Sequence, residues 1–259
     1  MATSTDDTHV EAEEDDTFEY AHGTVMILAW MVFASTAVLF ARYGRKIRFG
    51  SKDKLLGEHI WFQIHRFMAC LTTVLTLLGF FFILVQAKGD WVKADEGLVF
   101  VHSVIGGIVV CCALIQAWMA LFRCHPDGSY RFIYNWLHRL TGVLAYFLSV
   151  PTIFIIITTF DNNRTGMIVI LSLWSAWVVI IVIILEIIRL GIGPSFSGKM
   201  VKGNGAELYD LNGPPSVNTE SDEGDTSHWH TRILILILLN FIVSIALAIP
   251  LIVLLWKKT

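Results

Sequence analysis

Charged residues are scarce in this chain, and their scarcity limits the kind of protein it can be. Only 16% of its 259 residues are Asp, Glu, Lys or Arg, whereas 55% are hydrophobic, and the mean hydropathy is +0.63. Soluble domains carry about 25% charged residues. The composition therefore excludes a soluble globular domain and is typical of a polytopic membrane protein.

Cysteine is scarce as well, and a secretory signal is missing. Cys70, Cys111 and Cys112 lie inside apolar stretches and Cys124 lies at the end of one, so they do not form a disulfide framework. We interpret them as small apolar packing residues. The first 21 residues contain no basic segment followed by a short apolar core and a cleavage site, so no removable signal is expected.

Six apolar runs are long enough to cross a bilayer, which takes about 20 residues. They cover residues 22–43, 60–86, 98–122, 134–160, 166–190 and 231–256. We therefore expect an all-α fold, a polytopic membrane helix bundle with six transmembrane helices. The expected parts are an acidic extracytoplasmic tail (1–21), a five-helix domain (22–190), a flexible cytoplasmic linker (191–230) and a C-terminal transmembrane helix (231–259).

Lysine and arginine are distributed unevenly between the loops, which predicts the orientation. Six of them lie between residues 42 and 54, whereas none precedes His22, two lie in 87–97 and one lies in 161–165. Basic residues are enriched in cytoplasmic loops. We therefore expect the loops after the first, third and fifth spans in the cytoplasm and both termini outside.

Four histidines lie near the starts of four successive spans. His22, His65, His102 and His138 are separated by 43, 37 and 36 residues, which is one helix plus one loop each time. Helices joined by short loops alternate in direction, so His22 can meet His102 at the outer face and His65 can meet His138 at the cytoplasmic face. Histidine inside a membrane is usually functional. Two such pairs are what two bis-imidazole haems require.

The expected cofactors are two non-covalent haem b groups. The outer iron would lie between His22 and His102, and the cytoplasmic iron between His65 and His138. No CxxCH segment for covalent attachment occurs in the sequence.

Three of the expected ligands are followed one turn later by a small residue that leaves room for a flat cofactor: Ala69, Gly106 and Gly142. Small residues also line ordinary contacts between transmembrane helices, which is the alternative interpretation.

Three arginines are candidate partners for haem propionates. Arg66 and Arg139 directly follow the two cytoplasmic-side histidines, and Arg42 lies at the cytoplasmic end of the first span. Arginine forms bidentate hydrogen bonds with carboxylates. The alternative is that these residues follow the positive-inside bias and reach for lipid phosphates, which explains Arg42 equally well.

Together these residues resemble the cytochrome b561 family. The resemblance rests on these segments: His22-Gly23, Ala41-Arg-Tyr, Phe62-Gln-Ile-His65-Arg66, His102 with Gly106, Phe122-Arg, and Asn135-Trp-Leu-His138. It covers about residues 22–190 and is closest to the membrane half of animal ferric-chelate reductases, without their reeler and DOMON domains. It implies a di-haem helix bundle that moves single electrons from a cytoplasmic donor, commonly ascorbate, to an outer ferric chelate or monodehydroascorbate.

The resemblance also provides a candidate residue for the donor site. Arg131, seven residues before His138, resembles the ascorbate-contacting arginine of the ascorbate-using branch. That branch also carries lysines in the turns before its second ligand histidine, whereas residues 57–64 contain none here, and Lys52 and Lys54 lie nearby. A basic cytoplasmic face would attract an anionic donor such as ascorbate.

We therefore expect a transmembrane oxidoreductase, a ferric reductase, in the plasma membrane or an endomembrane vesicle. Its expected partners are ascorbate or another small reductant, a ferric chelate or monodehydroascorbate outside, and the lipid bilayer, but no nucleic acid; a homodimer is left open. Two other functions stay open. A histidine-lined proton or metal-ion transporter predicts polar residues at mid-membrane depth, where Gln116 is the main one. A non-enzymatic membrane scaffold leaves the four histidines unexplained.

Five other histidines and one sequon receive no role. The histidines are His9, His59, His125, His228 and His230, which lie outside the four ligand positions. Asn163-Arg-Thr165 is a glycosylation sequon in a short outer loop. A glycan there would lie against the membrane, so we expect Asn163 to be unmodified.

Overall fold

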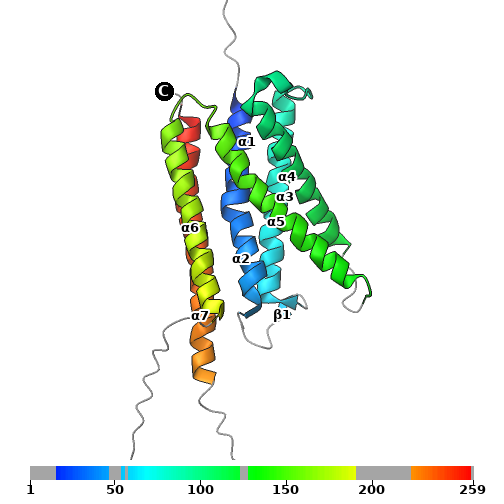
Figure 1. The fold of residues 1–259 in the computed structure, drawn as a ribbon, viewed down its shortest axis with the longest axis vertical. Coiled ribbons are helices and arrows are strands. Elements are labelled where there is room, and N and C mark those ends of the chain that lie inside the picture. Colours follow the sequence, from blue (N-terminus) through cyan, green and yellow to red (C-terminus); the bar gives the residue numbers. More distant parts are fainter. Residues whose placement is uncertain (1–15, 47–53, 56–57, 123–127, 191–222, 258–259) are drawn as a thin grey trace, which may run out of the picture. The chain divides into compact units, whose positions relative to one another are not determined.

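The fold is known from a computed structural model, which describes residues 16–46, 54–55, 58–122, 128–190 and 223–257 (Figure 1). Six helical segments among these residues are long and apolar enough to cross a membrane. The strands of the described part are β1 (Lys54–Leu55) and β2 (Glu58–His59), which form one short antiparallel ladder. The expected all-α fold with six transmembrane helices is therefore confirmed, and the chain is a multi-pass membrane protein.

The helices follow the apolar runs closely. They are α3 (Ile60–Gln86), α4 (Leu98–Leu121), α5 (Arg131–Ile157), α6 (Arg164–Leu190) and α7 (Glu223–Trp256). Helices are expected throughout these runs because a bilayer core offers no hydrogen-bond partners for an open backbone. α7 begins at Glu223, inside the segment expected to be a linker, and the linker bounds stay a prediction. The preceding linker residues, 191–222, lie outside the described residues.

The first span, Thr17–Tyr43, contains two kinds of helix. α1 (Thr17–Ile27) passes into a π-helical segment, η1 (Leu28–Ala34), and then into α2 (Ser35–Tyr43). Ser35 Oγ donates to the Met31 carbonyl at 2.6 Å, and Thr36 Oγ1 donates to the Val32 carbonyl at 2.8 Å. These hydroxyl groups bond to carbonyls of the wide π turns, where the regular α-helical ladder is interrupted. The helix starts within the expected tail, and residues 1–15 lie outside the described residues.

The described residues form two compact units. The first unit comprises those within residues 1–28, 73–164 and 252–259. In it α4 packs along α5, and the end of α7 lies beside α1. Trp256 Nε1 donates to Thr24 Oγ1 at 2.9 Å, and the Trp256 ring lies 5.5 Å from that of Tyr20. The last helix is thus packed next to the turn that carries His22.

The second unit comprises residues 29–72 and 165–251 and has an apolar core between three helices. The fully buried core residues come from α2, α6 and α7: Leu39, Phe40, Tyr43, Ile181, Leu185, Ile233 and Ile237. α6 and α7 run side by side in opposite directions (Figure 1). Trp174 Nε1 donates to Ser244 Oγ at 3.1 Å, so a polar contact links these two helices within the apolar layer.

The cysteines only partly follow the expectation that they pack inside the bundle. Cys112 is buried, whereas Cys70 and Cys111 are exposed on their helices and all three are free thiols. Exposed positions on a membrane helix face lipid or a neighbouring element rather than the core, so among the three described cysteines the packing interpretation holds for Cys112 alone. Cys124 lies outside the described residues.

Candidate functional site

His22 and His102 come together in the first unit. His22 lies in the second turn of α1 and His102 in the second turn of α4, and their ring centroids are 6.2 Å apart with an interplanar angle of 81°. A metal–imidazole bond is about 2 Å and a ring nitrogen lies about 1 Å from the ring centre, so two imidazoles on one metal have centroids about 6 Å apart. The spacing of these two rings therefore fits a shared metal such as haem iron.

Hydrogen bonds fix which nitrogen of each ring can bind a metal. His22 Nδ1 lies 2.8 Å from the Gly79 carbonyl oxygen of α3, and His102 Nδ1 lies 2.9 Å from the Thr152 carbonyl oxygen of α5. A carbonyl oxygen only accepts, so Nδ1 carries the proton and donates in both rings. Nε2 is left with its lone pair, which is the arrangement that metal-ligating histidines use.

The glycines near this pair differ in the space they leave. A Cβ on Gly106, one turn after His102, would meet only Thr152 Cγ2 at 3.9 Å, so this face of α4 is open enough for a flat group. A Cβ on Gly79 would meet Val25 Cγ2 at 2.7 Å and Met26 Cε at 3.0 Å. Gly79 therefore allows α1 and α3 to approach where its carbonyl accepts from His22.

His65 shows the same hydrogen bonding in the second unit. Its Nδ1 lies 2.9 Å from the Ala37 carbonyl oxygen of α2, so this ring also donates from Nδ1, the tautomer that metal-ligating histidines commonly use. The ring of Phe62, one turn earlier on α3, lies 6.5 Å from the imidazole. His65 therefore has the tautomer and fixed orientation that a haem ligand requires.

The turn that carries His138 is fastened to α4 in the first unit. Gln116 Nε2 donates to the His138 carbonyl oxygen at 2.8 Å and also bonds to Thr141 Oγ1. The hydroxyl of Tyr134, one turn earlier on α5, bonds to the Met119 carbonyl oxygen. The Tyr134 ring lies parallel to that of His138, with centroids 6.3 Å apart. The bonds that Gln116 and Tyr134 make hold the start of α5 against the end of α4.

Gly142 faces the same amide of Gln116. A Cβ on Gly142 would lie 3.5 Å from Gln116 Nε2, which is an ordinary contact. The space beside Gly142 is therefore bordered by a polar side chain. A Cβ on Gly106 would instead lie 3.9 Å from the Thr152 methyl carbon, so the two glycines that the sequence groups together have different neighbours.

The arginines predicted near the cytoplasmic-side histidines have exposed or partly exposed side chains. Arg66 is exposed, with its guanidinium 5.9 Å from the Phe62 ring centroid, and Arg139 is exposed on α5. Arg131 lies at the first turn of α5, with its guanidinium 5.4 Å from the Tyr134 ring centroid. Arg131 and His138 thus both lie near the Tyr134 ring.

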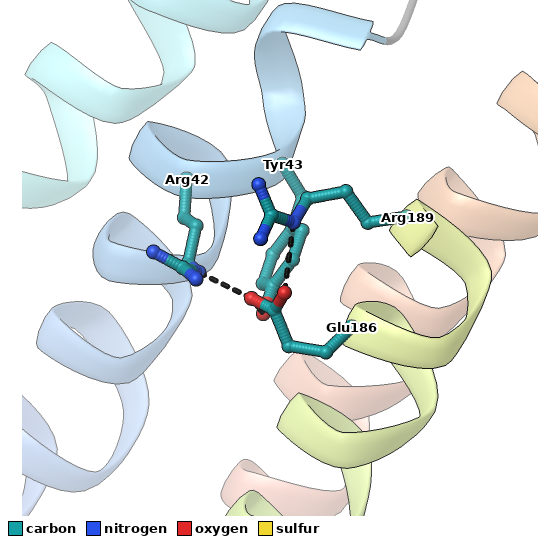
Figure 2. A network of polar contacts seen from close by, with 4 residues as sticks. All are labelled: Arg42, Tyr43, Glu186 and Arg189. Carbon is teal, nitrogen blue, oxygen red and sulfur yellow. Dashed lines mark hydrogen bonds and ion pairs between the residues drawn. The ribbon is translucent and has the colours of Figure 1, made fainter. Parts of the chain in front are cut away.

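Arg42 has a different partner, which the sequence pattern does not reveal. Its Nε donates to Glu186 Oε1 of α6 at 2.5 Å, and the Tyr43 hydroxyl donates to the same oxygen at 2.7 Å. Arg189 Nε donates to Glu186 Oε2 at 2.8 Å. Figure 2 shows the two guanidinium groups converging on this carboxylate from α2 and α6. Arg42 is therefore fixed by α6 through an ion pair.

Among the described residues, the other features singled out in the sequence form no metal cluster. No group of three or more His, Cys, Asp or Glu that could hold a metal ion occurs among the described residues. His59 is exposed on β2. His9 and His125 lie outside the described residues, and of His228 and His230 the structure describes only the helical backbone. Asn163 Nδ2 donates to the carbonyl of Lys257 at 3.1 Å, at the end of α7.

Known proteins resemble this chain in sequence. Residues 21–163 match the sequence model of the family described as eukaryotic cytochrome b561. Ferric-chelate reductase 1 of Homo sapiens is 36% identical over 134 residues, which are 52% of this chain and 22% of that protein. Ferric-chelate reductase 1 of Mus musculus is 34% identical over 135 residues, again 52% of this chain and 22% of that protein.

A plant relative covers a similar part of the chain. A cytochrome b561 and DOMON domain-containing protein of Arabidopsis thaliana is 27% identical over 136 residues, which are 51% of this chain and 26% of that protein. The matched region thus spans about a quarter of the length of these curated relatives. No solved structure matches. The family match includes all four candidate ligand histidines, whereas α6 and α7 lie beyond it.

Proposed function

The chain belongs to the eukaryotic cytochrome b561 family, and from this we propose that it is a transmembrane oxidoreductase that moves single electrons from a cytoplasmic donor to an outer acceptor. The proposed cofactors are two non-covalent haem b groups, which when bound supply the one-electron redox chemistry, because bis-imidazole iron has no open coordination site. The side chains then have to bind and orient the haem groups and shield them from water. No side chain performs covalent chemistry.

The observation that carries this proposal is the His22–His102 pair. Two rings from different helices lie at the centroid spacing of a shared metal, 6.2 Å, and each donates Nδ1–H to a carbonyl of a further helix. A histidine that merely reached for water would have no reason to lie at this spacing from a second imidazole. We propose that these two residues ligate the outer haem iron.

His65 and His138 are the proposed ligands of the cytoplasmic-side haem iron. The Ala37 carbonyl supports this for His65, because it fixes the Nδ1–H tautomer. Gln116 and Tyr134 support it for His138, because they hold its turn of α5 against α4. Arg66 and Arg139 are the proposed propionate partners, since both follow a ligand and are exposed. For Arg42 the propionate role stays a prediction beside its ion pair with Glu186.

Ascorbate is the proposed donor, and Arg131 is the proposed residue that contacts it. Arg131 lies at the first turn of α5, on the side that the positive-inside pattern assigns to the cytoplasm. A cation there attracts an anionic reductant. A ferric chelate is the proposed acceptor, because the human and mouse relatives are named ferric-chelate reductases; monodehydroascorbate is the other acceptor that the family resemblance implies.

A haem count tests the proposal directly. We would record a pyridine haemochrome spectrum of the purified protein and a reduced-minus-oxidised difference spectrum with ascorbate and then dithionite. Two b haems per chain, at least partly reduced by ascorbate, are expected. His59→Ala is the matched control, because His59 is exposed on β2 and should leave both haems in place. Folded protein without haem would contradict the proposal and favour the transporter or the scaffold.

Transmembrane electron transfer needs its own measurement. Vesicles containing the protein would be loaded with ascorbate and supplied outside with a ferric chelate and a coloured ferrous-iron chelator. Colour should form only in vesicles that contain both the protein and internal ascorbate. Arg131→Gln should raise the ascorbate concentration that gives half-maximal iron reduction, and it should leave the haem spectrum unchanged. Haem-loaded protein that fails to reduce external iron would leave the cofactor assignment standing and overturn the ferric-reductase assignment.

A further inference from the structure

The last turn of α7 packs against α1 in the first unit. Trp256 Nε1 donates to Thr24 Oγ1 at 2.9 Å, and Thr24 Oγ1 in turn donates its proton to the Tyr20 carbonyl oxygen at 2.8 Å. The Trp256 and Tyr20 rings lie 5.5 Å apart. Leu255 is buried, and a Cβ on Gly23 would lie 2.8 Å from its Cδ2 atom. A hydrogen bond, a ring contact and close packing therefore hold α1 against α7.

His22 lies on the opposite side of α1. At about 3.6 residues per turn, a residue two positions away from both Tyr20 and Thr24 lies across the helix from them. On that side His22 Nδ1 donates to the Gly79 carbonyl oxygen at 2.8 Å, and the His22 ring lies 6.2 Å from that of His102. α1 thus lies between the last turn of α7 and the histidine pair. A movement of α1 toward or away from α7 therefore changes the spacing of the two rings.

The last turn of α7 is itself anchored in the first unit. Asn163 Nδ2 donates to the Lys257 carbonyl oxygen at 3.1 Å and lies 3.4 Å from that of Leu254. Trp256 therefore belongs to a helix end whose carbonyls have a partner. A metal site tolerates changes of only about 0.2 Å in its ligand distances. A helix that carries a haem ligand thus benefits from a fixed neighbour of this kind.

We propose that Trp256 and Leu255 are positioning residues for His22. They hold α1 at the distance from α4 at which His22 and His102 can share one haem iron, and they act through the helix rather than on the imidazole itself. This inference rests on the two-haem function proposed above and extends it to α7, which lies beyond the matched family region. The alternative is that the last turn of α7 only stabilises the bundle, without a selective effect on one haem.

Two substitutions in the full chain separate these roles. Trp256→Phe keeps an aromatic ring but removes the donor to Thr24, and Leu255→Ala removes the side chain that packs on Gly23. Each haem would be followed by its midpoint potential, by its low-spin ferric electron paramagnetic resonance signal and by its rate of transfer to apomyoglobin. His22→Ala identifies the outer haem, because this variant should lose it.

Both substitutions should act on the outer haem alone. We expect each of them to shift the potential and the resonance signal of that haem and to speed its loss about 10-fold, the effect of disturbing the support of a metal-ligating histidine. The other haem should stay unchanged. Equal shifts of both haems, or an outer haem that neither substitution changes, would overturn the positioning role.

Each variant has a matched control. Val253 precedes Leu255 by two residues and is 58% exposed, whereas Leu255 is 8% exposed. Val253→Ala should therefore leave both haems unchanged. Trp118 is exposed near the end of α4, with its ring beside that of Phe122, so Trp118→Phe is the control for the loss of an indole. An equal effect of the variants and their controls would overturn the proposal, because it would show a general response to substitution.

The haem-free protein gives a readout that does not need the cofactor. Diethyl pyrocarbonate modifies neutral imidazoles, and mass spectrometry of the peptides gives the rate for each histidine. A displaced α1 exposes His22, so Trp256→Phe and Leu255→Ala should speed the modification of His22 about fivefold, the factor that corresponds to one lost hydrogen bond. The rate for His65 should stay the same.

The modification rates also separate this proposal from the proposed function. Unchanged His22 rates in both variants would overturn the positioning role. A wild-type protein that binds no haem would overturn the proposed function instead, and the His22 rates would then still decide whether the last turn of α7 positions this ring.

Discussion

The imidazole rings of His22 and His102 are nearly perpendicular with centroids 6.2 Å apart, and each ring is held by a backbone carbonyl of another helix. α1 and α4 supply the rings, whereas α3 and α5 supply the carbonyls of Gly79 and Thr152. Four helices therefore fix one pair of side chains. Ligands that are oriented before the metal binds lose little conformational freedom on binding, so such a pair is suited to retaining a non-covalent cofactor.

Pairs of alanine variants should show which histidines share a haem. His22→Ala with His102→Ala removes both ligands of one proposed centre, so this double variant should keep one haem per chain. His22→Ala with His65→Ala removes one ligand from each proposed centre and should lose both haems. The measurement is the pyridine haemochrome count of protein that elutes as a single species. The His22→Ala and His102→Ala single variants should each also keep one haem.

The haem counts would contradict the pairing in one clear way. If His22→Ala with His65→Ala keeps one haem while His22→Ala with His102→Ala keeps none, His22 and His65 share a centre. His59→Ala, combined with His22→Ala, serves as the control for introducing two substitutions. That combination should match His22→Ala alone, since His59 is exposed on β2.

Gly79→Ala should disturb the His22–His102 pair without substituting either histidine. The added Cβ would lie 2.7 Å from Val25 Cγ2 and 3.0 Å from Met26 Cε, so α1 and α3 must move apart. This moves the Gly79 carbonyl away from His22 Nδ1 and weakens the bond that orients the ring. We expect one haem to be lost more easily during purification. Loss of a hydrogen bond that orients a metal-ligating histidine typically lowers the affinity for the metal about 10-fold.

Gly142→Ala is the matched control for the glycine substitution. Its Cβ would meet Gln116 at 3.5 Å or beyond, which is an ordinary contact, so both haems should be retained. The two variants would be compared by haem content after identical washing with detergent. Equal retention by Gly79→Ala and wild type would show that the Gly79 carbonyl does not orient His22.

Gln116→Leu should weaken the centre that contains His138. The substitution removes the donor to the His138 carbonyl and to Thr141 Oγ1 while keeping an apolar side chain of similar size. A lost hydrogen bond of this kind costs about 1 kcal/mol. Gln116→Glu should cost more, because a carboxylate oxygen would then face a carbonyl oxygen. Thermal unfolding and haem content of both variants check the order.

A spectroscopic measurement separates positioning from mere stability. If Gln116 positions His138, the Gln116→Leu variant should shift the midpoint potential of one haem and leave that of the other unchanged. A variant with reduced stability but two unchanged potentials would contradict the positioning role. Cys111→Ser, at an exposed position of the same helix, is the control and should change neither potential.

The apolar runs predict the six spans because a bilayer sets both the length and the composition of a helix that crosses it. α3 matches its run at both ends, since the loops on either side are polar. The four candidate ligand positions are also visible in the sequence, because a histidine in an apolar run is unusual. The π segment Leu28–Ala34 has no comparable signal, since its residues suit an α-helix equally well.

The supporting contacts could not be predicted for a related reason. The carbonyls of Gly79, Ala37 and Thr152 belong to the backbone, so no residue type marks them as acceptors. The Arg42–Glu186 pair joins residues 144 positions apart, and the helix contact that unites them is not encoded locally. Asn240 was missed as well: it is fully buried in α7, with Nδ2 3.5 Å from Ser35 Oγ, and only its place in an apolar run marks it.

Asn163 should carry no glycan although it lies in a sequon. Its Nδ2, the atom that a glycan would modify, donates to the Lys257 carbonyl at 3.1 Å and lies 3.4 Å from that of Leu254. These carbonyls lie at the end of α7, where a helix has no internal partners for them. Asn163 also has a φ of 55°, which asparagine tolerates better than most residues. Its side chain therefore caps the C-terminal end of α7.

Glycosidase treatment and two substitutions test this role together. The wild-type protein expressed in a glycosylating cell should not change in gel mobility after treatment, and neither should Thr165→Ala, which destroys the sequon. Asn163→Gly keeps the backbone conformation but loses the amide, at a cost of about 1 kcal/mol. Asn163→Asp should cost more, because it places a negative charge at the negative end of a helix dipole. A mobility shift in wild type that disappears in Thr165→Ala would show that Asn163 Nδ2 leaves its carbonyl partners and is modified.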